Sequence, residues 1–376
     1  MLLYAFMAIK AIGASYLPRS LLTIFSFIVN LTLMVVNKKD VPKLSTKAKL
    51  LMALREHAGK TLSGGKLASD FGISRVGVWK GIQSLINAGY LIKTSDSGYF
   101  LDSARTNDFL YPWEFGEKEP IFRFFESTAS TMDNARYFAS QGLAAGIIAV
   151  ADTQSAGRGR NGRTWASRHG GLYCSFLDRP AISLSDYCMP AMLYQIAVAK
   201  AVSSVCGKAA KLRWPNDIYI DGRKIAGIIT ELEAEGDMIK WLVTGIGVNV
   251  NNISPSAKAV NCSEILRHAV SRRTILKAII NEAERLKKSA GPIMAYAQGN
   301  RYLSAEWNTL ADCIGAKAAI VDSINISRDE KTRMLARGVF AGIDPAGRCI
   351  IKSNNNNETL YFNPGPVSLM FIGAGV

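Results

Sequence analysis

Three glycines and three arginines share seven consecutive positions, and this cluster is the part of the sequence best suited to chemistry. The segment is Gly157-Arg-Gly-Arg-Asn-Gly-Arg163. Glycine lets the backbone take positive φ values and come close to a ligand, and arginine carries a planar, permanently charged fork that suits carboxylate and phosphate groups. The segment therefore predicts an anion-binding loop. An exposed flexible turn, or an arginine-glycine segment that contacts nucleic acid nonspecifically, explains the same composition, and the spacing matches neither a P-loop nor a dinucleotide fingerprint.

A second charged segment follows downstream and predicts a β-hairpin. It runs Lys211-Leu-Arg-Trp-Pro-Asn-Asp-Ile-Tyr-Ile220, then Asp221-Gly222, then Arg223-Lys-Ile-Ala-Gly-Ile-Ile-Thr-Glu231. Asp-Gly between β-branched runs is a strong signal for a two-residue turn. Lys224 then begins the returning strand. A lysine there is commonly a solvated strand end, but beside an anion-binding loop it becomes a candidate for neutralising a phosphoryl group in a transition state.

Together these segments resemble biotin protein ligase, the enzyme that makes biotinyl-adenylate and passes biotin to a lysine of a carrier domain. The resemblance runs from about residue 45 to the C-terminus. It rests on motifs in the family's order, which are Ser130-Thr-Met-Asp-Asn-Ala135, Gly157–Arg163, Arg213-Trp-Pro-Asn-Asp217, Arg223-Lys-Ile-Ala-Gly227 and Gly245-Ile-Gly-Val-Asn249. Two positions depart from the family pattern: Arg213 stands where lysine is more common, and Asn161 where a basic residue is common.

The resemblance implies that biotin and ATP bind in one site. The implied biotin contacts are Ser130, Thr131, Met132, Gln154, Arg158, Gly159, Arg160, Lys224 and Gly227. The implied ATP or adenylate contacts are Gly157, Arg158, Arg160, Arg163, Trp165, Asn216 and Asn249. Lys224, Arg160 and Asp217 are the expected catalytic residues. Arg158 and Arg160 would close over the carboxylate and the phosphate, Lys224 would contact the reacting oxygens, and Asp217 would orient the nucleotide or the attacking amine. Mg²⁺ bound mainly through triphosphate oxygens is expected, with no protein metal site.

Composition favours anionic partners and a reducing compartment. The chain has 376 residues, a formal net charge of +15 and 48% hydrophobic residues, which allows two or three domains with sizeable cores. The charge suits nucleic acid, phosphorylated ligands, an acidic carrier protein or an anionic membrane surface, and it does not choose among them. The six cysteines are scattered with no Cys-x-x-Cys pair. This argues for free thiols in the cytoplasm and against a zinc site or a disulfide framework.

Residues 1 to 36 form an apolar extension with two explanations. Leu21 to Val36 is a nearly uninterrupted apolar run, with Arg19 before it and Lys38-Lys39 after it. About 20 apolar residues are needed to cross a bilayer, so the run is short for a membrane span. No signal-peptide cleavage site follows it. The extension is either an upstream stretch before a true start at Met34, which we favour, or a membrane anchor.

Residues 44 to 102 predict a winged helix-turn-helix that binds DNA. Apolar residues recur at helical spacing after Ser45, Ser63 and Ser74, with Gly72 at the turn, and Tyr90 to Phe100 is typical of a wing. The segment is basic, which suits phosphate contacts. The expected DNA-binding residues are Ser63, Lys66, Ser74, Arg75, Val76, Trp79 and Lys80. A module used only for packing or protein contact has the same pattern. The resemblance implies operator DNA and repression of biotin synthesis genes.

The rest of the chain predicts a mixed α/β (α+β) fold. Residues 120 to 308 alternate strands and helices and form the expected biotin/ATP-binding ligase domain, with a central mixed sheet. Residues 313 to 376 show short strands with tight turns, which predict a small β-barrel similar to the family's SH3-like C-terminal domain. A polar and aromatic connector, residues 105 to 119, joins the first two domains. We expect residues 37 to 102 to be removable without exposing the catalytic sheet.

The expected function is ATP-dependent activation of biotin to biotinyl-5'-AMP and transfer to a biotin carboxyl carrier protein, joined to biotin-responsive repression. Two alternatives stay open. One is a lipoate or octanoate ligase of the same fold, against which the Gly-Arg-Gly-Arg loop argues, and the other is a ligand-responsive repressor without catalysis. The resemblance also implies a homodimer when the adenylate is bound. We expect a cytoplasmic protein without membrane contact unless residues 1 to 36 are an anchor.

Overall fold

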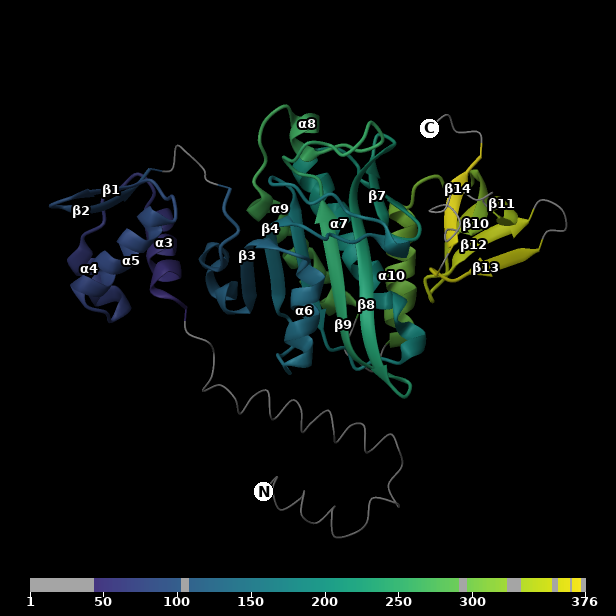
Figure 1. Ribbon diagram of the computed structural model, residues 1–376, viewed down its shortest axis with the longest axis horizontal. Coiled ribbons are helices and arrows are strands. Elements are labelled where there is room, and N and C mark those ends of the chain that lie inside the picture. Colours follow the sequence, from purple (N-terminus) through teal and green to yellow (C-terminus); the bar gives the residue numbers. More distant parts are fainter. Residues whose placement is uncertain are drawn as a thin grey trace, which may run out of the picture. The chain divides into compact units, whose positions relative to one another are not determined.

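The computed structural model describes residues 44–102, 108–290, 296–322, 333–353, 358–365 and 367–372. These residues form a helical module with a two-stranded wing, a seven-stranded mixed sheet with helices on both faces, and a five-stranded antiparallel sheet (Figure 1). The predicted fold class is confirmed. The apolar extension predicted at residues 1 to 36 lies outside the described residues.

The N-terminal module is the predicted winged helix-turn-helix. Its elements are α3 (Thr46–Glu56), α4 (Gly64–Phe71), α5 (Arg75–Asn87), β1 (Ile92–Ser95) and β2 (Gly98–Leu101). Ser45 and Ser74 cap α3 and α5, because their hydroxyls accept hydrogen bonds from backbone N–H groups at 3.2 and 3.0 Å. Gly72 ends α4 with φ of 62°, a left-handed conformation that favours glycine. Local capping and turn signals therefore fix where the three helices begin and end.

The central sheet has the strand order β3-β4-β5-β9-β8-β7-β6, and only β3 and β4 run parallel. Its strands are β3 (Phe122–Thr128), β4 (Ile148–Gln154), β5 (Leu172–Asp178), β6 (Lys211–Arg213), β7 (Asp217–Ile220), β8 (Arg223–Glu235) and β9 (Met238–Val248). The long pair β8–β9 places Gly227 opposite Gly247 and Ile229 opposite Gly245. Because residues two apart in a strand share a face, these three glycines lie on one face of the sheet.

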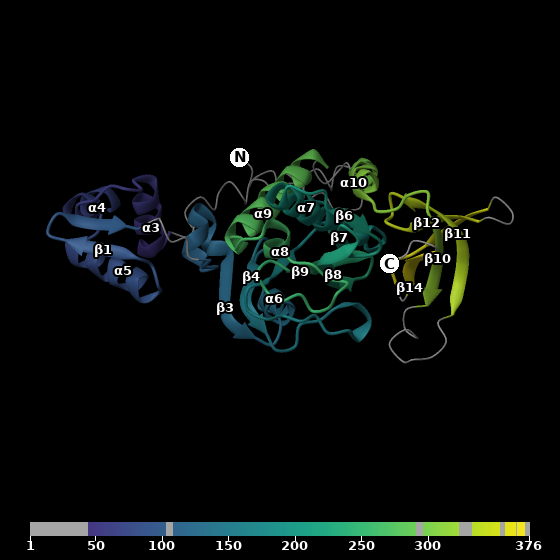
Figure 2. The same ribbon diagram turned by 90° about the horizontal axis from the view of Figure 1, so that it is seen from above.

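Helices cover both faces of this sheet. On one face lies α6 (Thr131–Ser140), and on the other lie α7 (Cys188–Cys206), α9 (Arg272–Ser289) and α10 (Tyr296–Leu310) (Figure 2). The short α8 (Cys262–Leu266) precedes α9. Within the described chain, Leu184–Cys206 has the length and apolarity of a membrane span, but 67% of its apolar 18-residue window is buried inside the protein. We describe it as a core helix, since α7 packs in the main hydrophobic cluster.

The C-terminal sheet contains one strand that the sequence did not reveal. Its strands are β10 (Lys317–Asp322), β11 (Met334–Ile343), β12 (Cys349–Ser353), β13 (Thr359–Phe362) and β14 (Val367–Phe371), in the order β13-β12-β11-β10-β14. The short strands expected between residues 313 and 376 correspond to the first four of these. The unpredicted β14 pairs with β10 from Asp322 to Ala318, and it lines the functional cavity described below.

The described part of the connector, from residue 108 onward, is packed against the winged helix. It continues into the 3-10 segment η3 (Pro112–Ile121). Its aromatic rings form a continuous series: the ring centroids of Phe109 and Tyr90 lie 5.2 Å apart, those of Phe109 and Tyr111 5.2 Å, and those of Tyr111 and Trp113 4.6 Å. Tyr111 also meets Phe124 of β3 at 5.0 Å. Ring contacts of this kind fix the winged helix to the ligase domain.

Glu114 is the charged centre of this junction. Its side chain is fully buried and pairs with Arg55 of α3 at 2.7 Å, while Arg273 of α9 and the Tyr90 hydroxyl also donate to it. Burial raises the pKa of the Glu114 carboxyl, but the hydrogen bond and charge of Arg55 and the charge of Arg273 outweigh it, so the pKa lies below its ordinary value. The carboxylate thus joins three segments of the chain.

This packing argues against the expectation that residues 37 to 102 can be removed freely. Their removal would expose the aromatic rings of the connector and take Arg55 and Tyr90 from a buried carboxylate. A buried charge that loses a partner is costly. The winged helix is therefore part of the folded unit rather than a detachable module.

Replacing Glu114 with glutamine should destabilise the protein by about 2 kcal/mol at neutral pH, because charged hydrogen bonds become neutral ones. The pKa of Glu114 is lowered in the folded state. Its contribution is therefore present above the unfolded-state pKa of about 4.3 and is lost as pH falls through the folded value. Urea unfolding of parent and variant at pH 7 and at decreasing acid pH measures this. The exposed Glu117→Gln is the control; an equal loss in both variants would contradict the role of Glu114.

Candidate functional site

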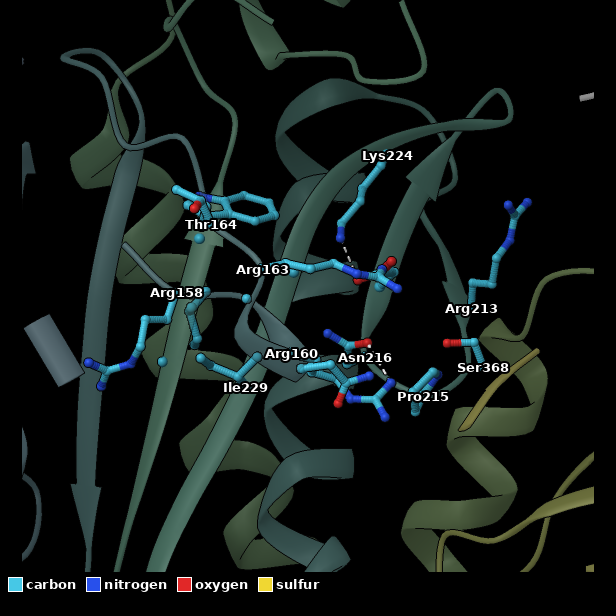
Figure 3. Close-up of a pocket in the computed structure, with 18 of the residues that line it drawn as sticks. Arg158, Arg160, Arg163, Thr164, Arg213, Pro215, Asn216, Lys224, Ile229 and Ser368 are labelled. Atoms are coloured by element: carbon cyan, nitrogen blue, oxygen red, sulfur yellow. Dashed lines mark hydrogen bonds and ion pairs between the residues drawn. The ribbon is translucent and has the colours of Figure 1, made fainter. Parts of the chain in front are cut away.

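A cavity of about 640 Å³ lies between the α6 face of the central sheet, the glycine-arginine loop and the C-terminal strand β14 (Figure 3). Its lining carries a strong excess of positive charge. The cations are Arg158, Arg160, Arg163, Arg213, Lys224 and Lys258, and the one carboxylate among the lining residues is that of Asp217. Such a cavity suits a ligand, or a pair of ligands, with several negative charges.

Three glycines make the floor of the cavity flat. A Cβ atom on Gly247 would lie 2.5 Å from the Trp165 indole, one on Gly227 2.9 Å from the same ring, and one on Gly245 2.6 Å from the Met132 sulfur. Side chains at these positions would fill the space that Trp165 and Met132 now reach. The Trp165 indole nitrogen is buried and has no hydrogen-bond partner among the described residues. A polar ligand atom beside it would satisfy this donor.

The glycine-arginine loop is a small hairpin. The Gly159 N–H donates to the Arg163 carbonyl at 2.7 Å, and the Trp165 N–H donates to the Gly157 carbonyl at 2.9 Å. The tip is the 3-10 turn η4 (Arg160–Gly162), where Asn161 has φ of 56° and Gly162 has φ of 72°. Of the three loop glycines, Gly162 alone takes a positive φ. Gly157 is needed for another reason, since a Cβ there would lie 2.4 Å from the Ser167 hydroxyl.

Arg160 is held by neutral groups. Its guanidinium donates to the carbonyls of Gly365 and Val367 and, at 3.4 Å, to the Asn216 side chain (Figure 3). Burial lowers the pKa of the guanidinium below its ordinary value. In the described part of the chain no carboxylate forms an ion pair with it. A desolvated cation without a counter-ion is poised to bind an anion.

Lys224 stands at the start of β8, as predicted, and reaches into the cavity. Its ammonium lies 2.7 Å from the Asp217 carboxylate and 5.2 Å from the Trp165 ring centroid. The backbone on both sides is fixed, because the Lys224 N–H donates to the Lys258 carbonyl at 2.9 Å and its carbonyl accepts from Val260 at 3.0 Å. The catalytic candidates Lys224, Asp217 and Arg160 all line the same cavity.

The start of α6 supplies polar groups to one end of the cavity. The Ser130 hydroxyl caps the helix, and the Thr131 N–H donates to the Gln154 side-chain oxygen at 2.8 Å. The Gln154 amide nitrogen donates to the Ser167 hydroxyl at 2.8 Å. These hydrogen bonds orient the side chains relative to one another, which limits the reorganisation that binding requires.

Most of the predicted ligand residues come together here. Those that line the cavity are Ser130, Thr131, Met132, Gln154, Arg158, Gly159, Arg160, Arg163, Trp165, Asn216, Asp217, Lys224 and Gly227. Gly157 and Asn249 are not among the lining residues. Asn249 is 1% exposed and accepts a hydrogen bond from the Asn252 side chain at 3.1 Å, so it holds the beginning of the loop that carries Lys258.

The seven predicted DNA-binding residues are all exposed on α4, α5 and their caps. The large apolar side chains Val76 and Trp79 of α5 are 60% and 53% exposed. Sequence reasoning missed Lys258 and the residues of β14 that line the cavity. No sequence signal marks these positions, because their place in the site depends on how a loop and a separate domain pack.

Comparison with known proteins agrees with this geometry. A family model described as the biotin/lipoate A/B protein ligase family matches residues 124–249, and one described as an HTH domain matches residues 46–100. The bifunctional ligase/repressor BirA of Bacillus spizizenii is 35% identical over 217 residues, which cover 56% of this chain and 67% of that protein. The chain belongs to the biotin protein ligase family.

Two further relatives extend the comparison with this ligase. The biotin--[acetyl-CoA-carboxylase] ligase of Paracoccus denitrificans is 27% identical over 243 residues, covering 62% of this chain and 92% of that protein. The solved structure of the biotin protein ligase from Aquifex aeolicus in complex with biotin and ATP aligns with a TM-score of 0.52 at 23% identity, covering 67% of this chain and 99% of that chain. The structural match shows a shared fold.

Replacing Gly247 of this ligase with alanine should weaken ligand binding while the fold survives. The new methyl group would push the Trp165 ring off the floor, and one methyl group in a fitted pocket changes binding roughly ten- to hundredfold. Calorimetric titration with biotin, together with thermal melting, measures both effects. Gly222→Ala is a contrasting variant outside the cavity, expected to lower stability because of its φ of 73° without changing biotin affinity. Unchanged biotin affinity in Gly247→Ala would contradict the claim that biotin binds against the glycine floor.

Proposed function

We propose that this ligase joins biotin to AMP at the expense of ATP and then transfers biotin to a lysine of a biotin carboxyl carrier protein. The observation that carries the proposal is the cavity that gathers six cations around one carboxylate on a glycine floor. The first reaction brings a carboxylate and a triphosphate together, so their mutual repulsion must be offset by positive side chains. The named relatives act on biotin, which favours it over lipoate or octanoate.

In the first step a biotin carboxylate oxygen attacks the α-phosphorus of ATP, and the bond from that phosphorus to the pyrophosphate oxygen breaks. Lys224 and Arg160 neutralise the charge that builds on the phosphoryl and carboxylate oxygens. The biotin ring system lies on the glycine floor. Its polar ureido group faces the hydrogen-bonded set of Thr131 and Gln154.

In the second step the uncharged amine of the carrier lysine attacks the acyl carbon, and AMP leaves with the bonding electron pair. Asp217, which already pairs with Lys224, orients the amine by accepting a hydrogen bond from it. The intermediate must be shielded from water until the carrier arrives. The glycine-arginine loop and β14, which line the cavity, provide that shield.

Mg²⁺ fits this site as a companion of ATP. The described residues contain no group of three or more His, Cys, Asp or Glu side chains that could hold a metal ion, and Mg²⁺ commonly keeps waters and binds substrate phosphates. Asp217 is the lining residue that could contact it. When bound, the ion would neutralise part of the triphosphate charge.

Replacing Lys224 with alanine should slow biotinyl-adenylate formation by about a hundredfold or more, because a charge that stabilises the transition state is lost. The fold should persist, since the Lys224 side chain is partly exposed and outside the core. Biotin-dependent exchange between ATP and pyrophosphate measures the reaction. Lys208→Ala is the matched control, because Lys208 pairs with Asp221 at the outer turn of the same hairpin. Parent-like exchange in Lys224→Ala would refute the assignment.

We further propose that α5 binds operator DNA and that the ligand-bound protein acts as a dimer. Exposed Arg75, Trp79 and Lys80 lie on one helix that begins after a helix-turn-helix turn, the geometry that enters a major groove.

The proposed dimer rests on a free sheet edge, because β7 pairs with β8 only as far as Gly227. The rest of β8, from residue 229 to 235, has no second neighbour among the described strands. Such an edge offers backbone groups to a second copy.

The free thiols support a reducing compartment, which we propose is the cytoplasm. All six cysteines are unpaired, and five of them are buried.

DNA from upstream of biotin synthesis genes should bind the full-length protein more tightly when biotin and ATP are both present. The Lys66→Ala/Lys80→Ala variant should bind less tightly, and its salt dependence should fall by about 0.9 in slope for each lost phosphate contact. Fluorescence anisotropy titrations at several salt concentrations, with sedimentation velocity on the same samples, measure binding and dimer formation. Ligand-independent binding by a monomer would contradict the proposal.

A further inference from the structure

Arg158 differs from its loop neighbour Arg160 in what holds it. One guanidinium nitrogen of Arg158 donates to both carboxylate oxygens of Asp133, at 2.9 and 3.0 Å, and the other donates to Glu231 at 3.3 Å. In Figure 3 the Arg158 side chain points away from Lys224, while Arg160 lies beside Asn216. Two carboxylates thus hold the first loop arginine on the outer side of the cavity.

These contacts belong to a closed charge cluster, the outer cluster, formed by Asp133, Arg136, Arg158 and Glu231. Arg136 donates to Asp133 within α6 and lies 3.3 Å from Glu231. Two positive and two negative side chains balance within it. The charge of Arg158 is therefore already matched before any ligand arrives, and its pKa is raised because hydrogen bonds and charges from Asp133 and Glu231 outweigh its burial.

The outer cluster fixes the stem of the loop hairpin. Arg158 pairs with Thr164 across the stem, next to the hydrogen bonds that join Gly159 to Arg163 and Trp165 to Gly157. Asp133 lies in the first turn of α6 and Glu231 on β8, so the guanidinium ties the loop to two rigid elements. Holding the stem there leaves the tip, with Arg160, over the cavity.

We propose that Arg158 is a positioning residue, which acts through the outer cluster to hold the loop closed over the adenylate and does not itself bind the ligand. An anion that draws Arg158 into the cavity must separate it from two carboxylates, whereas Arg160 is held by carbonyl and amide oxygens that carry no net charge. Charged partners are the stronger ones. The two loop arginines therefore have different roles: Arg158 anchors the loop, and Arg160 contacts the ligand.

The test removes the anchor and leaves Arg158 in place. In the Asp133→Asn/Glu231→Gln variant, the Arg158 fork is free to reach a ligand. This inference rests on the proposed function, so the first measurement is release of labelled biotinyl-adenylate from the purified variant. Release should be about five- to tenfold faster than from the parent, KM for biotin should rise, and kcat for adenylate formation should change little. Arg158→Met should give the same result, and Arg158→Lys should restore part of the retention.

Two controls sharpen the result. Arg136→Met removes a member of the outer cluster that does not touch the loop, so adenylate retention should stay near that of the parent. The variant with Asp133→Asn, Glu231→Gln and Arg158→Met together should be no worse than either set alone, because both sets remove the same two ion pairs of Arg158. Additive losses would show that Arg158 has a separate role on the ligand and would overturn the proposal.

A second measurement does not depend on the reaction. Trypsin should cleave the ligand-free Asp133→Asn/Glu231→Gln variant after Arg160 and Arg163 faster than it cleaves the parent, as read by mass spectrometry. Retention equal to or tighter than the parent in this variant, with loss in Arg158→Met, would show direct ligand binding by Arg158 and overturn the inference. A parent that makes no adenylate would instead refute the proposed function, and the cleavage rates would then decide the inference alone.

Discussion

Six positive side chains line one cavity, and the surrounding structure has to offset their mutual repulsion. The chain meets it with a different partner for each of four of them: carboxylates for Arg158 and Lys224, backbone carbonyls for Arg160, and a carboxylate with an aromatic face for Arg213. Each partner comes from another segment, so the loop, the β7–β8 hairpin, α6 and the C-terminal sheet are held in register by charge as well as by packing. The positive charge left over explains why the cavity suits anions.

Arg213, at a position where we expected lysine to be more common in the family, joins two parts of the structure. Its guanidinium donates to Asp312 at 3.1 Å through Nε and to the same oxygen at 2.5 Å through Nη2, and its Cζ atom lies over the Tyr219 ring, 3.7 Å from the centroid. It also approaches Phe371 of β14 at 5.4 Å. A lysine could match the charge but not the fork and the stacked plane together. Here the arginine ties the C-terminal sheet to the edge of the catalytic sheet.

Local signals in the sequence predicted the parts of the site that local chemistry determines. Asp221 and Gly222 take the positive φ values, 49° and 73°, that their hairpin turn requires, and Ser74 caps α5, the helix expected to begin after it. The floor glycines and the loop arginines were visible as motifs. The contribution of β14, the approach of Lys258 and the partners of Arg158 were not, because each depends on contacts between residues far apart in the chain, which periodicity and turn signals do not encode.

The shared carboxylate of Glu114 also limits how this protein can diversify. A winged helix taken from a relative would have to supply its own counterparts of Arg55 and Tyr90. Without them the buried carboxylate would lose two partners and keep Arg273. The side chains of Val76 and Trp79 are mostly exposed and take no part in this junction. Substitutions on that surface of α5, which we propose contacts DNA, therefore leave the junction intact, whereas Arg55 of α3 and Tyr90 stay under the constraint of the buried carboxylate.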